Sequence, residues 1–502
     1  MYYYFFQSKN SYIRKRYRNA IKIKTPLENG CCSIMPKIYV YLWFDIEDYI
    51  TKESDDLPLI ALNILEKYGI PATCKLVAEK IRFLEENGRT DVISTISRFD
   101  VGFHTNTHSQ HPTAYEYLAN LDVLSGADEF IAHEKVGVEK IKQTFSRTPS
   151  CFGQGGPIWA PHVYPALAKL EIPMYLDETP ILNVENQPYW YCGVLNLNGA
   201  NENCIRFDNT FEKEDGIRVL KRKFKKIHNK LQSRGGAISV LYHLHTIINA
   251  KYWDKLNFAN GKNIPRSEYK RPPAQPEEIT QRAWRNYEEF VRYMHSFKDV
   301  KFITATDALK IYPRTHLKLN RQRLLQVARH FRNSSDYMKL GKAYISPAEA
   351  FYAVTRAIAN QNEFMPEGLE LKETLGPMAP FQSRGKKKLK ITDFVEAART
   401  TLEWMNSKNC LPTSITVGNY AQLNPQDFLS TACRLFLNSH TRKSFPEQIS
   451  RSTAKPPNQK YISLSKFRRA CKWVVLPNGF KAPKILEQIK LQAWTLKPAI
   501  PN

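Results

Sequence analysis

The sequence predicts an α/β fold in which parallel strands, each followed by a helix, close into a barrel. Short apolar runs alternate with segments of helical periodicity from residue 38 to residue 303. Charged or imidazole side chains stand at the ends of several apolar runs, as catalytic groups do at the carboxyl ends of barrel strands. One barrel needs about 250 residues and the chain has 502, so a mainly helical C-terminal domain is also expected.

The expected elements alternate along the barrel region. Strands are expected at residues 38–44, 72–77, 99–103, 174–176, 237–242 and 300–303. Helices are expected at residues 57–68, 85–98 in part, 129–145, 161–170, 219–231 and 275–295. Gly69 follows the first helix and Pro161 begins a later one, as helix ends and starts favour. This order predicts a parallel sheet.

The rest of the chain divides around this barrel. The expected parts are a basic N-terminal extension (1–35), the barrel (36–314), a helical linker region (315–390) and a small helical domain (391–502). In the last part, residues 391–405 and 425–437 are expected to form helices around a short strand at 414–418.

Two histidines four residues apart follow the apolar run 99–103. A turn there can bring His104 and His108 together as ligands of a divalent metal ion. Such a pair alone is more often a surface or core feature, but catalytic zinc needs a third protein ligand, and residues 45–48 contain three carboxylates. Asp45 interrupts an apolar run, which a helix N-terminus would not explain. The two motifs together predict a metal site.

Residues 36–313 resemble the polysaccharide deacetylase superfamily, also called the NodB homology or carbohydrate esterase 4 group. Its acidic first motif is similar to Asp45, Glu47 and Asp48, and its second motif is matched in full by the segment from His104 to His108. The resemblance implies a distorted barrel of about seven strands and a divalent metal, with zinc favoured.

Three further family motifs follow in order. Gln154 stands where the third motif carries an arginine, Asp177 resembles the aspartate of the fourth, and His243 resembles the histidine of the fifth. The family arginine orients the catalytic base through its charge, whereas Gln154 can offer a hydrogen bond but no charge.

The resemblance implies a role for each matched residue. Asp45 would be the general base, and Glu47 would complete the metal shell with His104 and His108, with Asp48 as the competing ligand.

His243 would be the general acid that protonates the departing amine, and His245 is the alternative acid because it would point the same way on a strand. His111 is expected in a supporting position or a loop, since three histidines and a carboxylate would close the metal to substrate. Trp159 and Tyr242 could stack on a sugar or belong to the core.

The charge and composition limit the kinds of binding partner that are expected. The net charge is +25, with basic clusters at residues 14–16, 221–226 and 384–388. This charge favours polyanions, but no nucleic-acid module is recognised, so a charged glycan or a membrane surface is at least as good a partner. No apolar run approaches the roughly eighteen residues of a membrane span. The N-terminus lacks the pattern of a secretory signal, which favours a cytoplasmic location.

The C-terminal domain resembles, over about fifty residues, the pseudomurein-binding repeat of cell-wall-associated proteins. That resemblance implies that the domain binds a cell-wall polymer, and the plainer interpretation is a generic helical domain. Three segments, at 345–351, 423–428 and 462–467, each place a capping residue before a helix.

The sequence therefore predicts a metal-dependent hydrolase that removes acetyl groups from an N-acetylated carbohydrate. Two alternatives stay open. One is an allantoinase-like hydrolase of a small amide, and the other is a non-catalytic glycan-binding protein on a decayed barrel.

Overall fold

The computed structural model describes residues 37–178, 181–198, 202–360, 368–442 and 444–501. The expected N-terminal extension, residues 1–35, lies outside the described residues. Within the described residues, no helix has both the length and the apolar character needed to cross a lipid bilayer.

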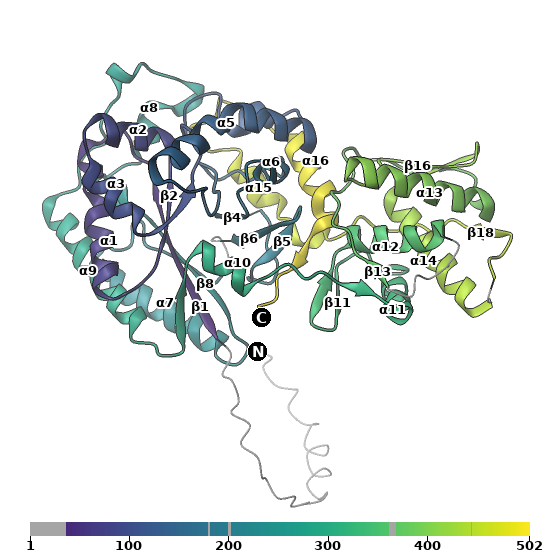
Figure 1. Cartoon of the computed structure of the whole chain (residues 1–502). Helices are drawn as coiled ribbons and strands as arrows, with labels where there is room; N and C mark the ends of the chain where they lie inside the picture. The colour runs from purple at the N-terminus through teal and green to yellow at the C-terminus, as the bar shows by residue number, and fades with distance from the viewer. Residues whose placement is uncertain (1–36, 179–180, 199–201, 361–367, 443, 502) are drawn as a thin grey trace, which may run out of the picture. The chain divides into compact units, whose positions relative to one another are not determined.

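A parallel sheet forms the centre of the first region (Figure 1). Its strands are β1 (Ile38–Ile46), β2 (Thr73–Leu76), β3 (Asp100–Phe103), β7 (Cys204–Arg206), β8 (Gly236–His243) and β9 (Val300–Ile303). The order is β3-β2-β1-β8-β7, with β9 also paired to β1, and every pairing is parallel. All nine residues of β1 are buried, which explains why its run is almost continuously apolar.

A second set of strands continues this sheet. These strands are β4 (Met174–Asp177), β5 (Tyr189–Tyr191), β6 (Val194–Asn198) and β19 (Lys497–Pro498), in the order β19-β5-β6-β4. Phe152 forms parallel bridges to Phe103 on one side and to Tyr175 on the other, so it links β3 to β4. The structure confirms a mixed α/β fold with a parallel core, while barrel closure and the count of seven strands stay predictions.

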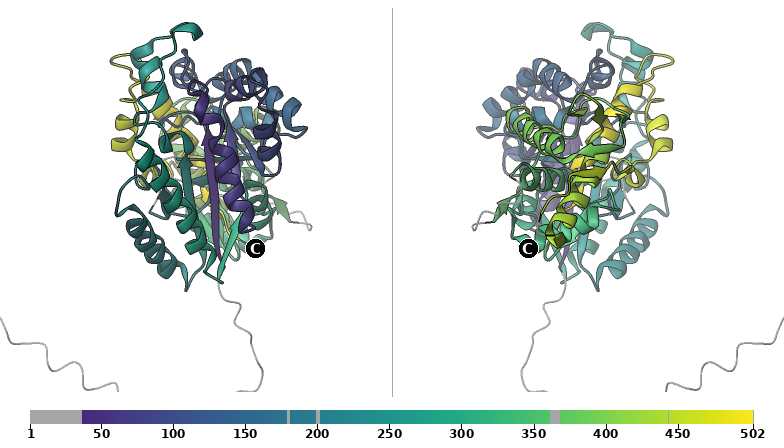
Figure 2. Two further views of the ribbon diagram at one scale, coloured as in Figure 1. Left: turned by 90° about the vertical axis from the view of Figure 1, so that its left-hand side faces the viewer. Right: turned by 90° about the vertical axis from the view of Figure 1, so that its right-hand side faces the viewer.

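Helices flank the sheet of the first region (Figures 1 and 2). They are α1 (Leu57–Lys67), α2 (Ala78–Glu86), α3 (Thr90–Ser97), α4 (Ala114–Leu118), α5 (Val123–Phe145), α6 (Val163–Lys169), α7 (Gly216–Leu231), α8 (Trp253–Asn257), α9 (Glu277–His295) and α10 (Ala305–Ile311). Each helix and strand expected in this region is present within a few residues. The helices α4, α8 and α10, most of α2, and the strands β5, β6 and β7 were not expected, because short elements carry little periodic signal.

A second hydrophobic core lies among α11 (Arg321–Phe331), α12 (Pro347–Ala359), α13 (Ile391–Lys408) and α14 (Pro425–Arg442). Short strands accompany these helices: β10 (Lys318–Leu319), β11 (Met338–Leu340), β12 (Ala343–Ile345), β13 (Leu369–Glu370), β14 (Arg384–Gly385), β15 (Lys388–Lys390), β16 (Ile415–Val417), β17 (Ala421–Leu423) and β18 (Gln448–Ser450). Ser346 caps α12 through a capping box, and the side chain of Asn424 accepts a hydrogen bond from the amide of Asp427 at the start of α14.

The last segment of the chain joins the first core. It contains α15 (Leu464–Ala470) and α16 (Pro483–Gln492), and it ends in β19, which pairs with β5. Phe467, Ile485, Ile489 and Leu496 are buried in the same cluster as the strands of the sheet. The four-part division of the chain stays a prediction, but its last part divides between two cores.

Candidate active site

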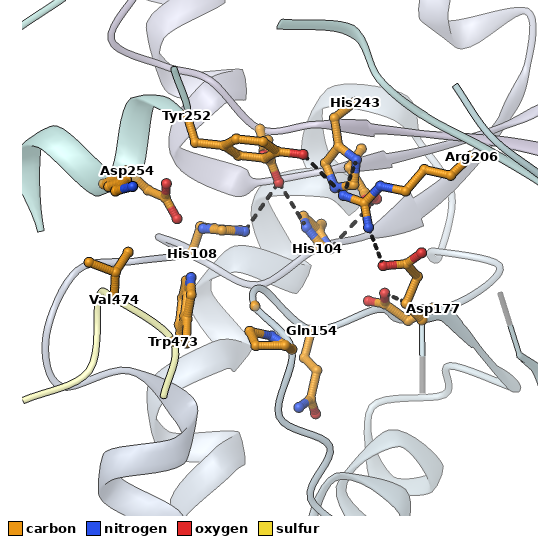
Figure 3. A pocket seen from close by; sticks show the side chains of 16 residues that line it. His104, His108, Gln154, Asp177, Arg206, His243, Tyr252, Asp254, Trp473 and Val474 are labelled. Carbon is orange, nitrogen blue, oxygen red and sulfur yellow. Dashed lines mark hydrogen bonds and ion pairs between the residues drawn. The ribbon is translucent and has the colours of Figure 1, made fainter. Parts of the chain in front are cut away.

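The carboxyl ends of the parallel strands surround one cavity of about 400 Å³ (Figure 3). β1 brings Asp45 and, just after it, Glu47, while β3 is followed by His104 and β8 ends at His243. Parallel strands share one edge for their carboxyl ends, so residues far apart in sequence meet there. Asp177, at the end of β4, lines the same cavity.

Glu47, His104 and His108 form a buried set of possible metal donors. Their donor atoms lie within 4.8 Å of one another. The Nε2 atoms of His104 and His108 lie 3.3 and 3.1 Å from Glu47 Oε2. Donors held about 2.0–2.1 Å from a tetrahedral zinc ion would lie roughly 3.3 Å apart, so these spacings fit such an ion.

The other ring nitrogens of the two histidines support this orientation. His104 Nδ1 lies 2.8 Å from the carbonyl oxygen of Gly153, to which it donates, and His108 Nδ1 lies 2.6 Å from the hydroxyl of Ser109. Ser109 in turn donates to Asp254. When Nδ1 is engaged in this way, Nε2 can face a metal, as in most protein metal sites.

A local turn carries His108 back to His104. Thr105 and His108 both adopt left-handed backbone conformations, with φ of 66° and 59°. The hydroxyl of Thr105 accepts a hydrogen bond from the amide of His108 at 2.9 Å. The expected turn after β3 is therefore present, and it requires two backbone conformations that residues other than glycine adopt infrequently.

Asp48 and His245 occupy different places from those of the donors. Both carboxylate oxygens of Asp48 are used, by the amides of Ile50 and Thr51 and by the side chain of Asn249. His245 does not extend β8, because a 3-10 helix (Leu244–Ile247) begins after His243. Its Nε2 lies 3.1 Å from Glu47 Oε1, so its ring supports that carboxylate.

Asp45 and His243 form an adjacent pair of an acidic and a basic side chain. His243 Nε2 lies 3.2 Å from Asp45 Oδ2, and His243 Nδ1 lies 2.8 Å from Asp208 Oδ2. Burial disfavours the charged form of His243, but Asp208, Tyr252 and Glu47 together outweigh it and raise the pKa of His243 well above its usual range. Burial alone would raise the pKa of Asp45, but His104 and Lys75 hold it below its ordinary value. These pKa shifts favour the ionised form of Asp45 and the protonated form of His243.

Lys75 is a site residue that sequence reasoning missed. Its fully buried ammonium group lies 3.0 Å from Asp45 and 3.1 Å from Asp177. Burial disfavours the charged lysine, but the two carboxylates raise its pKa. Burial also raises the pKa of Asp177, and the charge of Lys75 only partly opposes this. The position of Lys75 inside a strand expected to be buried (72–77) is the signal that could have indicated a buried ion pair.

Asp208 and Arg206 were also missed. Arg206 pairs with Glu178 and Asp208 and donates to the hydroxyl of Tyr252 at 3.0 Å. Asp208 additionally accepts a hydrogen bond from the backbone amide of His243. Arg206 is the last residue of the short strand β7, and Asp208 follows that strand. This strand was not expected, and its pairing with β8 places both residues beside His243.

The remaining candidate site residues differ in whether they line the cavity. Gln154 lines the cavity and donates to the hydroxyl of Tyr115, and no bond joins it to Asp45 among the described residues. His111 pairs with Glu116 outside the lining of the cavity. Trp159 is fully buried in the first core and donates to Tyr164. Tyr242 is buried in that core as well.

Comparisons with known proteins give only distant similarities. No known family profile and no curated protein match the sequence. The chain is similar to a solved 4-alpha-glucanotransferase from Thermococcus litoralis, with 11% identity and a TM-score of 0.37 over 55% of this chain and 40% of that one. The PuuE allantoinase matches with 12% identity and a TM-score of 0.38 over 56% and 93% of the two chains.

Proteins of carbohydrate esterase family 4 are also among the similar structures. A family 4 acetyl xylan esterase from Clostridium thermocellum, solved with a cobalt ion, has 12% identity and a TM-score of 0.28 over 54% of this chain and 90% of that one. The chain spans less than half of the glucanotransferase. All three TM-scores are below 0.4.

Proposed function

We propose that this protein is a metal-dependent hydrolase that removes the acetyl group from an N-acetylated carbohydrate. The observation that carries the proposal is the arrangement of three metal donors, Glu47, His104 and His108, directly beside the carboxylate of Asp45 and the imidazole of His243. Hydrolysis of an amide needs both a proton acceptor for the attacking water and a proton donor for the leaving amine. The cavity offers one of each.

The donor set would bind a divalent ion, with zinc favoured by two imidazoles and one carboxylate. When bound there, such an ion would polarise the acyl carbonyl and make a nearby water more acidic. Asp45 would take a proton from the water that attacks the carbonyl carbon. Its low pKa keeps it ionised for this step, and Lys75 holds it in place.

His243 would complete the reaction by giving its proton to the amine nitrogen as the carbon–nitrogen bond breaks. The products are then acetate and a free amine, with the atoms of one water molecule divided between them. Asp208 would orient His243 and keep it protonated through its 2.8 Å contact with Nδ1. Gln154 carries no charge, so Lys75 would supply the positive charge beside Asp45.

The proposal is tested by removing the two metal-donating histidines. Wild type and His104→Ala/His108→Ala would be compared for bound metal and for acetate release from acetylated chito-oligosaccharides. We expect about one metal ion per wild-type chain and the loss of metal and activity together in the variant. His133→Ala is the matched control, because His133 lies on the partly exposed face of α5 and pairs with Glu129.

Two other outcomes would change the assignment. Metal-dependent hydrolysis of small amides without acetate release from saccharides would favour the small-amide alternative. A wild-type protein that binds no metal would exclude the hydrolase and favour a glycan-binding protein. Binding of a cell-wall polymer by the C-terminal domain stays a prediction.

A further inference from the structure

The last segment of the chain contributes one wall of the cavity. Trp473 and Val474 line it together with residues from the strand ends (Figure 3). Val475 lies in a buried cluster with Trp253, and Leu476 lies in another with Tyr115. These anchors come from loops and helices of the first region, so the wall is part of the folded structure.

The backbone of this segment is also hydrogen-bonded to neighbouring segments. The amides of Asn260 and Gly261 donate to the carbonyl oxygens of Val474 and Val475, both at 2.9 Å. The carbonyl oxygen of Ala470 accepts a hydrogen bond from the amide of Trp473. The position of Trp473 is therefore set by main-chain hydrogen bonds at Trp473 itself and at the two residues after it, as well as by packing.

The indole ring of Trp473 is held in one orientation. It meets the rings of His108 and Tyr115 edge to face, with centroids 6.1 Å apart in both cases and interplanar angles of 86° and 87°. Gly156, at a φ of +79°, packs against the six-membered ring, and a Cβ there would come within 2.6 Å of Cζ3. Only a residue without a side chain allows this close approach.

Two features leave the Trp473 side chain accessible to a ligand. The side chain is only half-buried, although it lies between two buried clusters. Within the part of the chain that the structure describes, its indole Nε1 has no recorded hydrogen-bond partner. An indole N–H group that has no partner within the protein can donate a hydrogen bond to water or to a ligand.

We propose that Trp473 is a specificity-determining residue that stacks on a sugar ring of an oligosaccharide substrate. The face of an indole ring is electronegative, and the C–H bonds on one face of a pyranose are weakly positive, so the two surfaces attract each other. The ring lies beside His108, so the stacked sugar would hold the substrate next to the metal donors. This inference rests on the proposed function and adds to it a requirement for carbohydrate beyond the acetyl group.

The test measures binding separately from catalysis. Wild type, Trp473→Ala, Trp473→Phe and Gly156→Ala, all as metal-loaded full-length chains, would be titrated with N-acetylglucosamine tetramer by calorimetry. We expect Trp473→Ala to weaken binding about tenfold, since an aromatic contact contributes roughly that much. Trp473→Phe should retain most of the affinity. Gly156→Ala should lose affinity because the new Cβ displaces the indole ring.

Catalysis supplies a second readout. For the tetramer, Trp473→Ala should raise KM about tenfold, and the loss should be several times smaller for 4-nitrophenyl acetate, which has no sugar ring to stack on the indole. Trp404→Ala is the matched control, because Trp404 is 44% exposed on α13 in the other core. Its affinity and kinetics should equal those of wild type.

The outcomes separate this inference from the proposed function. Trp473→Ala that binds the tetramer as tightly as wild type would overturn the role of Trp473, as would a wild type that binds no tetramer. Tetramer binding that depends on Trp473 without any acetate release would refute the hydrolase and leave the subsite standing. Equal losses for tetramer and 4-nitrophenyl acetate would show a damaged metal centre and would also contradict the inference.

Discussion

At the scale of single residues, one buried ammonium group forms ion pairs with two carboxylates. Lys75 contacts Asp45 and Asp177, and removing it would leave uncompensated negative charge in the interior. Breaking a buried ion pair costs about 3–5 kcal/mol. Lys75→Met should therefore lower the free energy of unfolding by that order and, because the base loses its cation, lower kcat about a hundredfold.

Lys497 offers a matched control for this prediction. It is also buried between two carboxylates, those of Glu349 and Glu373, but it lies away from the cavity. Lys497→Met should lose stability in chemical denaturation yet keep the kcat of the folded fraction. Equal kcat values for the two variants would show that the charge of Lys75 does not act on Asp45.

Glu134, on α5, should make stability depend on pH. It accepts a hydrogen bond from the amide of Asn106 at 2.6 Å, just after His104, and burial raises its pKa to about 7. Because the folded pKa lies above that of the unfolded chain, its stabilising contribution is complete below about pH 4.5. This contribution is lost as the pH rises through 7.

The measurement is the free energy of unfolding in urea at pH 5 and pH 8. Between these values wild type should lose roughly 3 kcal/mol more than Glu134→Gln, which cannot ionise. The difference between the two proteins isolates Glu134 from the other groups that titrate in this range. Parallel pH profiles for the two proteins would contradict the prediction.

At the scale of elements, α16 behaves as part of the first core. Ile489 is fully buried there, and truncating a buried isoleucine to alanine costs about 2–5 kcal/mol. Ile489→Ala should lower the unfolding midpoint of the sheet region, measured by denaturation with acetate release as a second signal. Leu464→Ala, at a position that is 42% exposed at the start of α15, should change it little.

At the scale of the whole molecule, the sheet region needs the end of the chain. A fragment of residues 36–314 would lose β19 and the buried residues of α15 and α16, which would expose β5 and its apolar neighbours. Exposed apolar surface of this kind destabilises a domain and promotes association. The fragment should therefore fail to unfold cooperatively and should be cleaved quickly by protease. Cooperative unfolding with wild-type metal binding would show that the barrel folds alone.

Local patterns were enough to predict much of the fold. Buried parallel strands such as β1 need apolar side chains on both faces, and amphipathic helices such as α9 repeat every 3.6 residues, so both leave a periodic trace in the sequence. Asp45, Glu47, His104 and His243 were predicted for a related reason. Each ends or follows a recognisable strand, and the parallel arrangement brings those ends together.

By itself, the sequence determined the α/β class, the order of the long elements and the residues at the strand ends, because these depend on short-range periodicity. Only the tertiary structure decided that Lys75 pairs with Asp45, that Asp208 contacts His243, and that Trp473 lines the cavity. Such contacts join positions far apart in the chain, and a single lysine, aspartate or tryptophan carries no periodic signal. Their placement follows from strand pairing and core packing, which the whole chain sets at once.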